Sequence, residues 1–120
     1  MWEVGFTEEF NSWWDTLNNK TQIKIDAVTH LLEQRGPSLE FPYSSHINGS
    51  KHSQMRELRI QAQGKPYRIF YAFDPERHAI LLIGGLKTDN KNWYQQFIAR
   101  ADNLYDKHLH HLGEKYGKTF

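Results

Sequence analysis

The run from Tyr67 to Phe73 constrains the fold more than any other part of the sequence. Its residues, Tyr-Arg-Ile-Phe-Tyr-Ala-Phe, are apolar at alternate and at adjacent positions, so both faces of a strand formed here would be apolar. Such a strand is expected inside a sheet rather than at its edge. Gly-Lys-Pro precedes the run and Asp74-Pro75 follows it. Both are turn signals, which favour short connections to neighbouring strands.

Further strands are predicted on either side of this run. Residues 55–61 alternate between polar and apolar side chains, residues 79–83 form the last strand, and residues 2–6 form the first. Residues 38–54 show no clear period and are predicted to be a loop. The alternation places one set of side chains on each face: Glu57, Arg59 and Gln61 on one, Leu58 and Ile60 on the other.

Helical periodicity covers the rest of the chain. Thr7 is placed to cap a first helix, and Asn19 with Gln22 resembles a capping box that opens a second. Apolar residues three or four apart over residues 93–112 predict a long C-terminal helix. The order β-α-α-β-β-β-α indicates a single α+β domain over residues 1–120. We expect a small, largely antiparallel sheet, an N-terminal helical hairpin and a C-terminal helix.

Charge is distributed unevenly, although the formal net charge is only +1. Residues 1–50 carry three Lys or Arg against seven Asp or Glu, whereas residues 51–91 carry eight against four. A contiguous basic block of this kind attracts polyanions. The lack of cysteine excludes a disulfide scaffold and thiolate metal sites, and no apolar run has the length of a membrane span. The first residues do not resemble a secretory leader, so a cytoplasmic location and no membrane partner are expected.

The basic block holds the side chains with the clearest chemical use. Neighbouring strands lie about 4.8 Å apart, so arginines on adjacent strands can converge on one phosphate. An alternative interpretation is that these arginines form ordinary ion pairs with acidic neighbours on a solvated surface. Arg68 favours a function, because a lone charge within an apolar run is costly without a partner or a purpose. The basic and aromatic members are Arg56, Arg59, Arg68, Tyr71, Lys87, Lys91 and Tyr94.

Two other patterns are weak. The segment from Gly84 to Thr88 superficially resembles a phosphate loop, but Leu86 separates glycine from lysine and the upstream glycine is missing. His108 and His111 lie one helical turn apart, but a structural metal site usually needs four protein ligands. No metal or other cofactor is therefore expected.

Three segments together point to a family. They are Gly-Ser-Lys-His-x-x-Met-Arg-Glu-Leu-Arg (49–59), Tyr-Arg-Ile-Phe-Tyr-Ala-Phe-Asp-Pro (67–75) and Ala-Ile-Leu-Leu-x-Gly-Gly-x-Lys (79–87), and residues 101–109 agree with them. This combination resembles the phage-derived Gp49/HigB branch of the RelE/ParE toxin superfamily. The resemblance implies a RelE-like fold and the toxin of a type II toxin–antitoxin system. Such a toxin is an mRNA endonuclease that works on the ribosome and is neutralised by a helix-turn-helix antitoxin.

The resemblance also implies the reaction and its phosphate-binding residues. The RNA's own 2′-hydroxyl attacks the adjacent phosphate without a metal, leaving a 2′,3′-cyclic phosphate and a 5′-hydroxyl. Arg68 matches the family's mid-strand basic residue, which steadies the cleaved phosphate. Arg59 matches a basic residue of the same face, and Lys87 matches the basic residue after the last strand.

The proton-transfer residues are less closely matched. Tyr94 matches a catalytic tyrosine, with Trp93 and Tyr71 as alternatives for the same space. Glu57 stands where some relatives carry a basic residue. The candidate general base is either Glu57 or a tyrosine, because neither Arg nor an ordinary Lys is a base at neutral pH. The expected catalytic residues are Glu57, Arg59, Arg68, Lys87 and Tyr94, and the expected RNA-binding residues are Lys51, Arg56, Tyr71 and Lys91.

Two alternative functions remain open on the sequence alone. A ParE-like relative would inhibit DNA gyrase by protein binding without a nuclease site, and a third possibility is a nucleic-acid-binding module without catalysis. The charge split gives one further expectation. A basic, DNA-binding antitoxin should dock on the acidic helical hairpin of residues 7–36 and exclude the toxin from the ribosome by its bulk.

Overall fold

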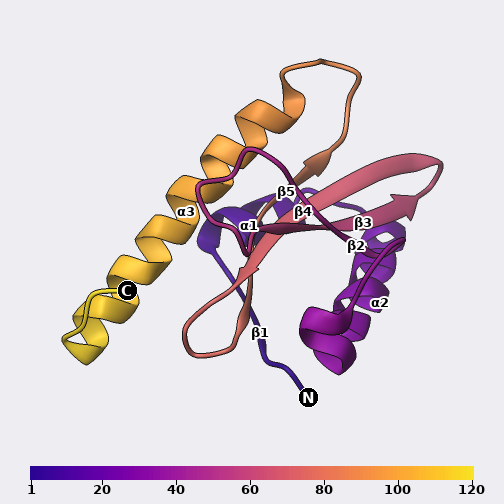
Figure 1. The fold of residues 1–120 in the computed structure, drawn as a ribbon. Helices are drawn as coiled ribbons and strands as arrows, with labels where there is room; N and C mark the ends of the chain where they lie inside the picture. The colour runs from indigo at the N-terminus through magenta and orange to yellow at the C-terminus, as the bar shows by residue number, and fades with distance from the viewer.

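A five-stranded sheet lies between two sets of helices in the computed structural model, which describes residues 1–120 (Figure 1). In spatial order the strands are β1 (Val4–Phe6), β5 (Ala79–Leu86), β4 (Lys65–Phe73), β3 (Arg56–Ala62) and β2 (Ser44–His46). The helices are α1 (Glu8–Trp14), α2 (Asn19–Arg35) and α3 (Trp93–Tyr116), with a 3₁₀ turn, η1, at Gly36–Ser38. None of the helices has both the length and the hydrophobicity that crossing a bilayer requires.

The predicted α+β class, helical hairpin and C-terminal helix are confirmed, with two differences in the sheet. First, residues 38–54 are not all loop, because Ser44–His46 pair with β3 as a short edge strand. Second, β1 runs parallel to β5, so the sheet is mixed at that edge. β1 and β2 are each only three residues long. Such short strands carry too little sequence pattern to predict their pairing, which depends on the longer strand beside each of them.

β4 is the central strand, as its doubly apolar sequence predicts. Ile69 and Tyr71 pack into the core beneath α1 and α2, whereas Phe70 and Ala72 pack into the core beneath α3. All four residues are fully buried. The sheet therefore has one hydrophobic core on each face.

The first two helices begin as their capping residues require. The Thr7 hydroxyl accepts a hydrogen bond from the Phe10 amide, as predicted for the α1 cap. The cap of α2 is Asn18 rather than Asn19, since the Asn18 side chain accepts from the Thr21 amide. The predicted capping box is therefore wrong: the Gln22 side chain donates to the Trp14 carbonyl instead of reaching back to the cap.

Two adjacent glycines allow helices to approach β5 closely on both faces. A Cβ at Gly84 would lie 2.2 Å from the Trp13 ring of α1, and a Cβ at Gly85 would lie 2.6 Å from the Phe97 ring of α3. Both distances are far below van der Waals contact. The glycines thus serve packing, which explains the motif that superficially resembles a phosphate loop.

We expect Gly84→Ala to destabilise the protein by about 1–3 kcal/mol, because the added methyl forces Trp13 out of a well-packed site. Urea unfolding of the natural and variant proteins measures this difference. The double variant with Trp13→Leu should lose less than the sum of the two single variants, since a smaller side chain relieves the clash. Strict additivity would contradict the packing role.

Tyr105 provides a pH-dependent contribution to stability. Burial, with a smaller contribution from the Asp74 carboxylate, raises the pKa of the Tyr105 phenol to about 12 from a reference value of 10.0. Between these values the unfolded chain binds fewer protons than the folded one, so this contribution is complete below about pH 10 and is lost as pH rises towards 12.

Tyr105→Phe should therefore flatten the alkaline decline in the free energy of unfolding by up to about 1.4 kcal/mol per pH unit. The measurement is a urea titration at a series of alkaline pH values. Because the phenol also donates to the Phe73 carbonyl at 2.9 Å, the slope with pH is compared rather than the absolute stability. Equal slopes in the two proteins would contradict the assignment.

Candidate active site

A buried carboxylate lies at the centre of the site. Glu57 on β3 is 4% exposed, and the Tyr94 hydroxyl at the start of α3 donates to its Oε1 atom at 2.7 Å. The Ser45 hydroxyl on β2 donates to its Oε2 atom, also at 2.7 Å. Two neighbouring elements of the fold thus fix both oxygens of the carboxylate.

Two arginines share this carboxylate. Arg59 Nη1 lies 3.3 Å from Glu57 Oε2, and Arg68 Nε lies 3.7 Å from Glu57 Oε1. Arg59 and Arg68 are directly opposite each other on β3 and β4, so their side chains leave the sheet on the same face. The ion-pair interpretation of these arginines is therefore correct in part: the charge within the apolar run has Glu57 as its partner.

Arg68 keeps donor capacity for a ligand. It is 7% exposed, its Nε atom lies 3.4 Å from the Tyr94 hydroxyl oxygen, and its Nη1 atom donates to the Tyr67 carbonyl at 3.0 Å. These hydrogen bonds do not use Nη2. A guanidinium with fixed orientation and free N–H groups is suited to phosphate oxygens.

The carboxylate and the tyrosine border a solvent-connected hollow of about 300 Å³. Lys87 adds a second kind of cation near Tyr94, with its Nζ atom 6.0 Å from the centre of the Tyr94 ring. The remaining lining residues are His46, Ile47, Asn48 and Ile98. Arg59, Arg68 and Lys87 do not line this hollow, but the two arginines contact Glu57 and Lys87 lies near the Tyr94 ring, so an acceptor and three cationic groups gather around these two residues.

The surroundings of Tyr94 keep its phenol protonated. Burial is the largest cause, and the hydrogen bond to Glu57 adds to it, so the pKa of Tyr94 lies above its ordinary value of 10.0. A protonated phenol donates its hydrogen to Glu57 and holds that carboxylate in place. Of the three aromatic candidates, Tyr94 occupies the site; Trp93 is buried in the α3 core and Tyr71 packs on the other face of the sheet.

The structure does not bring the predicted RNA-binding residues together. Arg56 and Tyr71 are cross-strand partners on the face opposite the arginine pair, because Arg56 is one residue out of phase with Glu57 and Arg59. The Arg56 Nη1 atom donates to the Pro37 carbonyl at 2.8 Å.

Lys51 and Lys91 lie outside the cluster as well. The Lys51 ammonium pairs with Asp106 on α3 at 2.8 Å, and this hydrogen bond raises the pKa of Lys51 and lowers that of Asp106. Lys91 is exposed in the segment that precedes α3. Exposure alone gives Lys91 no contact with the cluster, whereas Lys51 attaches its own loop to α3.

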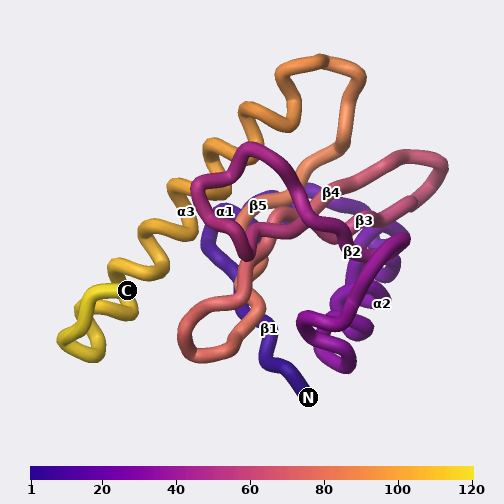
Figure 2. The backbone as a smooth tube through the Cα atoms, in the orientation of Figure 1, coloured from indigo at the N-terminus to yellow at the C-terminus, as the bar shows by residue number.

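Two residues for which the sequence indicated no role at the site, Ser45 and Asp102, flank the loop that contains Lys51. The loop connects β2 to β3 and runs across to α3 (Figure 2). Buried Asp102 on α3 holds it, accepting from the Ser50 hydroxyl at 2.5 Å and from the Lys51 amide at 3.0 Å. Asp102 on α3 thus holds the loop, and Ser45 reaches Glu57 through the pairing of β2 with β3; both contacts join parts of the chain that are distant in sequence.

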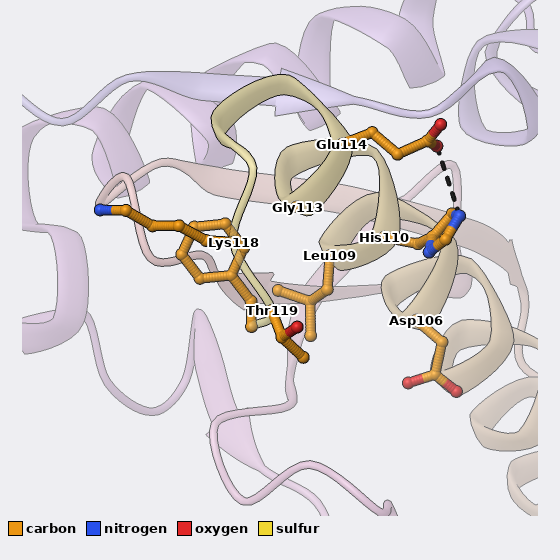
Figure 3. Close-up of a pocket in the computed structure, with 8 residues that line it drawn as sticks. Asp106, Leu109, His110, Gly113, Glu114, Lys118 and Thr119 are labelled. Carbon is orange, nitrogen blue, oxygen red and sulfur yellow. Dashed lines mark ion pairs between the residues drawn. The ribbon is translucent and has the colours of Figure 1, made fainter.

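Other clusters lie away from this site. Within the His-rich part of α3, His108 Nε2 lies 2.7 Å from the buried Asp74 carboxylate, which attaches the helix to the β4–β5 turn. A hollow of about 470 Å³ lies at the C-terminal end of α3, where His110 Nε2 lies 3.3 Å from Glu114 Oε1. In Figure 3 the last residues fold back towards Leu109. This hollow contains none of the predicted catalytic residues.

The order and arrangement of the sheet and its helices are those of the RelE fold. Free RelE from Escherichia coli has the same fold, with a TM-score of 0.58 and 15% identity over 83% of this chain and 98% of that one. RelE in the RelE–RelB complex from Pyrococcus horikoshii gives a TM-score of 0.52 at 15% identity, over 75% and 97% of the two chains.

Sequence comparison identifies the branch. Residues 12–106 match the model of the phage-derived Gp49-like proteins, and the chain belongs to this family. HigB2 of Mycobacterium tuberculosis, provisionally designated a toxin, is 38% identical over 111 residues, which is 88% of this chain but only 55% of that protein. HigB3 of the same organism, with the same designation, is 42% identical over 98 residues, 81% of this chain and 84% of that protein. The Gp49/HigB resemblance is confirmed.

Proposed function

We propose that this chain is the toxin of a type II toxin–antitoxin system and that it cleaves mRNA in the ribosomal A site. The observation that carries the proposal is the Glu57 carboxylate held by Tyr94 beside two arginines, which combines a proton acceptor with phosphate-binding groups. The relatives designated as toxins, HigB2 and HigB3, support the biological role.

In the proposed reaction the 2′-hydroxyl of the RNA attacks the adjacent phosphorus. The new bond joins the 2′-oxygen to phosphorus, and the bond from phosphorus to the 5′-oxygen breaks. Glu57 accepts the proton of the 2′-hydroxyl. In-line attack places the leaving oxygen on the opposite side of the phosphorus, so a separate group protonates it, and Lys87 beside Tyr94 is the group we assign.

The arginines act on the charge of the transition state. The phosphorane carries more negative charge than the ground-state phosphate, and Arg68 is already fixed by Tyr67 and Tyr94 before substrate arrives. A preorganised donor of this kind typically contributes about 3–4 kcal/mol. Because Glu57 neutralises part of the arginine charge, we expect tight placement of the RNA to depend on the ribosome and not on this cluster alone.

The proposed partner is a helix-turn-helix antitoxin, and the proposed location is the cytoplasm, where ribosomes and mRNA are found. Solved relatives include RelE in complex with RelB, which supports an antitoxin partner of some kind. The expected docking surface on α1 and α2 has a suitable hollow of about 320 Å³. Most of its lining is apolar and includes Phe6, Phe10 and Trp14, and two acidic residues, Asp26 and Glu33, also line it.

Two assays on the purified protein test the proposal. We expect it to stop translation in a cell-free system and to create new 5′ ends inside reading frames, while gyrase supercoiling continues. The Arg68→Ala variant is the control, and it should neither stop translation nor create new 5′ ends. Intact mRNA together with inhibited gyrase would favour the ParE-like alternative, and RNA binding without either effect would favour a non-catalytic module.

A further inference from the structure

An exposed phenylalanine lies next to the candidate active site. Phe41 is 69% exposed, and the guanidinium carbon of Arg59 lies 5.1 Å from the centre of its ring. The same guanidinium contacts Glu57 at 3.3 Å. Arg59 thus connects the catalytic carboxylate to an aromatic face that is open to solvent.

The backbone around Phe41 is held in place. The Arg59 amide donates to the Tyr43 carbonyl at 2.8 Å, which attaches the segment to β3. The Tyr43 and Ser44 amides both donate to the Glu40 carbonyl, at 3.0 and 3.1 Å, and close a turn around residues 40–44. The backbone that carries the ring is therefore fixed to β3, and the contact with the Arg59 guanidinium places the ring beside the catalytic carboxylate.

A second hollow, of about 510 Å³, opens beside the ring at the β2 edge of the sheet. Arg56 and His46 line it together with Phe41, and Glu40 contributes the one carboxylate. The charges nearly cancel, so the hollow is poorly suited to a phosphate. An aromatic wall next to a cation suits the flat face of a nucleobase instead, because stacking on an aromatic ring does not require net charge.

We propose that Phe41, backed by the Arg59 guanidinium, is the stacking platform for the base of the nucleotide next to the scissile phosphate. This inference rests on the proposed function. RNA is the favoured occupant because Arg59 joins the ring directly to the catalytic carboxylate. Arg56 lies on the opposite face of the sheet from the catalytic cluster, and its proposed role is to line the hollow that receives this base.

Single-turnover cleavage on programmed ribosomes tests the platform. The mRNAs carry a purine, a pyrimidine or an abasic nucleotide at the position on either side of the cleaved bond. We expect the natural protein to cleave the abasic mRNA about 5- to 100-fold more slowly at one of these positions, and to favour a purine there, because purines stack more strongly. Phe41→Ala should lose the same factor and no longer distinguish the three mRNAs, whereas Phe41→Trp should retain the preference.

Phe120→Ala is the matched control, since Phe120 is 44% exposed and lies at the C-terminal hollow, which contains none of the predicted catalytic residues. It should leave the preference unchanged. Equal cleavage of all mRNAs by the natural protein, or an unchanged preference in Phe41→Ala, would overturn the platform while leaving the nuclease intact. Loss of antitoxin binding by Phe41→Ala with unchanged cleavage would assign the ring to a protein partner and would also overturn the platform. Cleavage of no mRNA at all would remove the proposed function and the platform together.

Discussion

Arg68→Ala is expected to slow mRNA cleavage by about two to three orders of magnitude, which corresponds to a loss of about 3–4 kcal/mol of transition-state stabilisation. Arg68 lies beside Tyr94 and Glu57, with its guanidinium fixed by two hydrogen bonds. Alanine removes the charge that meets the phosphorane. The measurement is the single-turnover rate on programmed ribosomes.

The fold should survive this change. Glu57 keeps Arg59, Tyr94 and Ser45 as partners, so the buried carboxylate is not left alone. Arg68→Lys is the control. It keeps the positive charge but not the planar, two-pronged set of N–H donors of the guanidinium, and it should lose less activity than the alanine variant. A folded Arg68→Ala protein that cleaves at the natural rate would show that Arg68 is structural.

Glu57→Gln is expected to slow cleavage by about 10²- to 10⁴-fold, because the amide cannot accept the 2′-hydroxyl proton. The amide oxygen can still accept the hydrogen bond from Tyr94, so the local geometry is retained. The same ribosome assay measures the loss, and urea unfolding shows whether the variant is folded.

A substrate with sulfur in place of the leaving 5′-oxygen separates the two possible proton-transfer roles. Sulfur leaves without being protonated, so this RNA restores activity to variants that lack the general acid. We expect no such rescue of Glu57→Gln, whereas Lys87→Ala should be rescued. Rescue of Glu57→Gln would reverse the assignment of base and acid.

Much of the fold could be predicted because the strongest signals are local. A strand that is apolar on both faces must be central, and β4 is central with a core on each side. The helix N-terminus at Thr7 and the long α3 likewise follow from capping chemistry and periodicity. The parallel pairing of β1 could not be predicted, because three residues carry no signal for strand direction.

The site was predictable where residues two apart on a strand point the same way. The alternation in residues 55–61 places Glu57 and Arg59 together, and cross-strand register adds Arg68. The same alternation already separates Arg56 from Arg59, so grouping all three arginines on one surface overlooked the strand's own period. Ser45 was beyond prediction, since it reaches Glu57 only through the pairing of an edge strand with no pattern of its own.

The most direct test of the proposed chemistry is cleavage of an mRNA with a single 2′-deoxynucleotide at the bond that the natural protein cuts on the ribosome. We expect the unmodified mRNA to yield a 5′-hydroxyl on one fragment and a 2′,3′-cyclic phosphate on the other, and the 2′-deoxy mRNA to stay intact. Cleavage of the 2′-deoxy mRNA at the same bond would contradict attack by the 2′-hydroxyl, and with it the role of Glu57 as the base that accepts its proton.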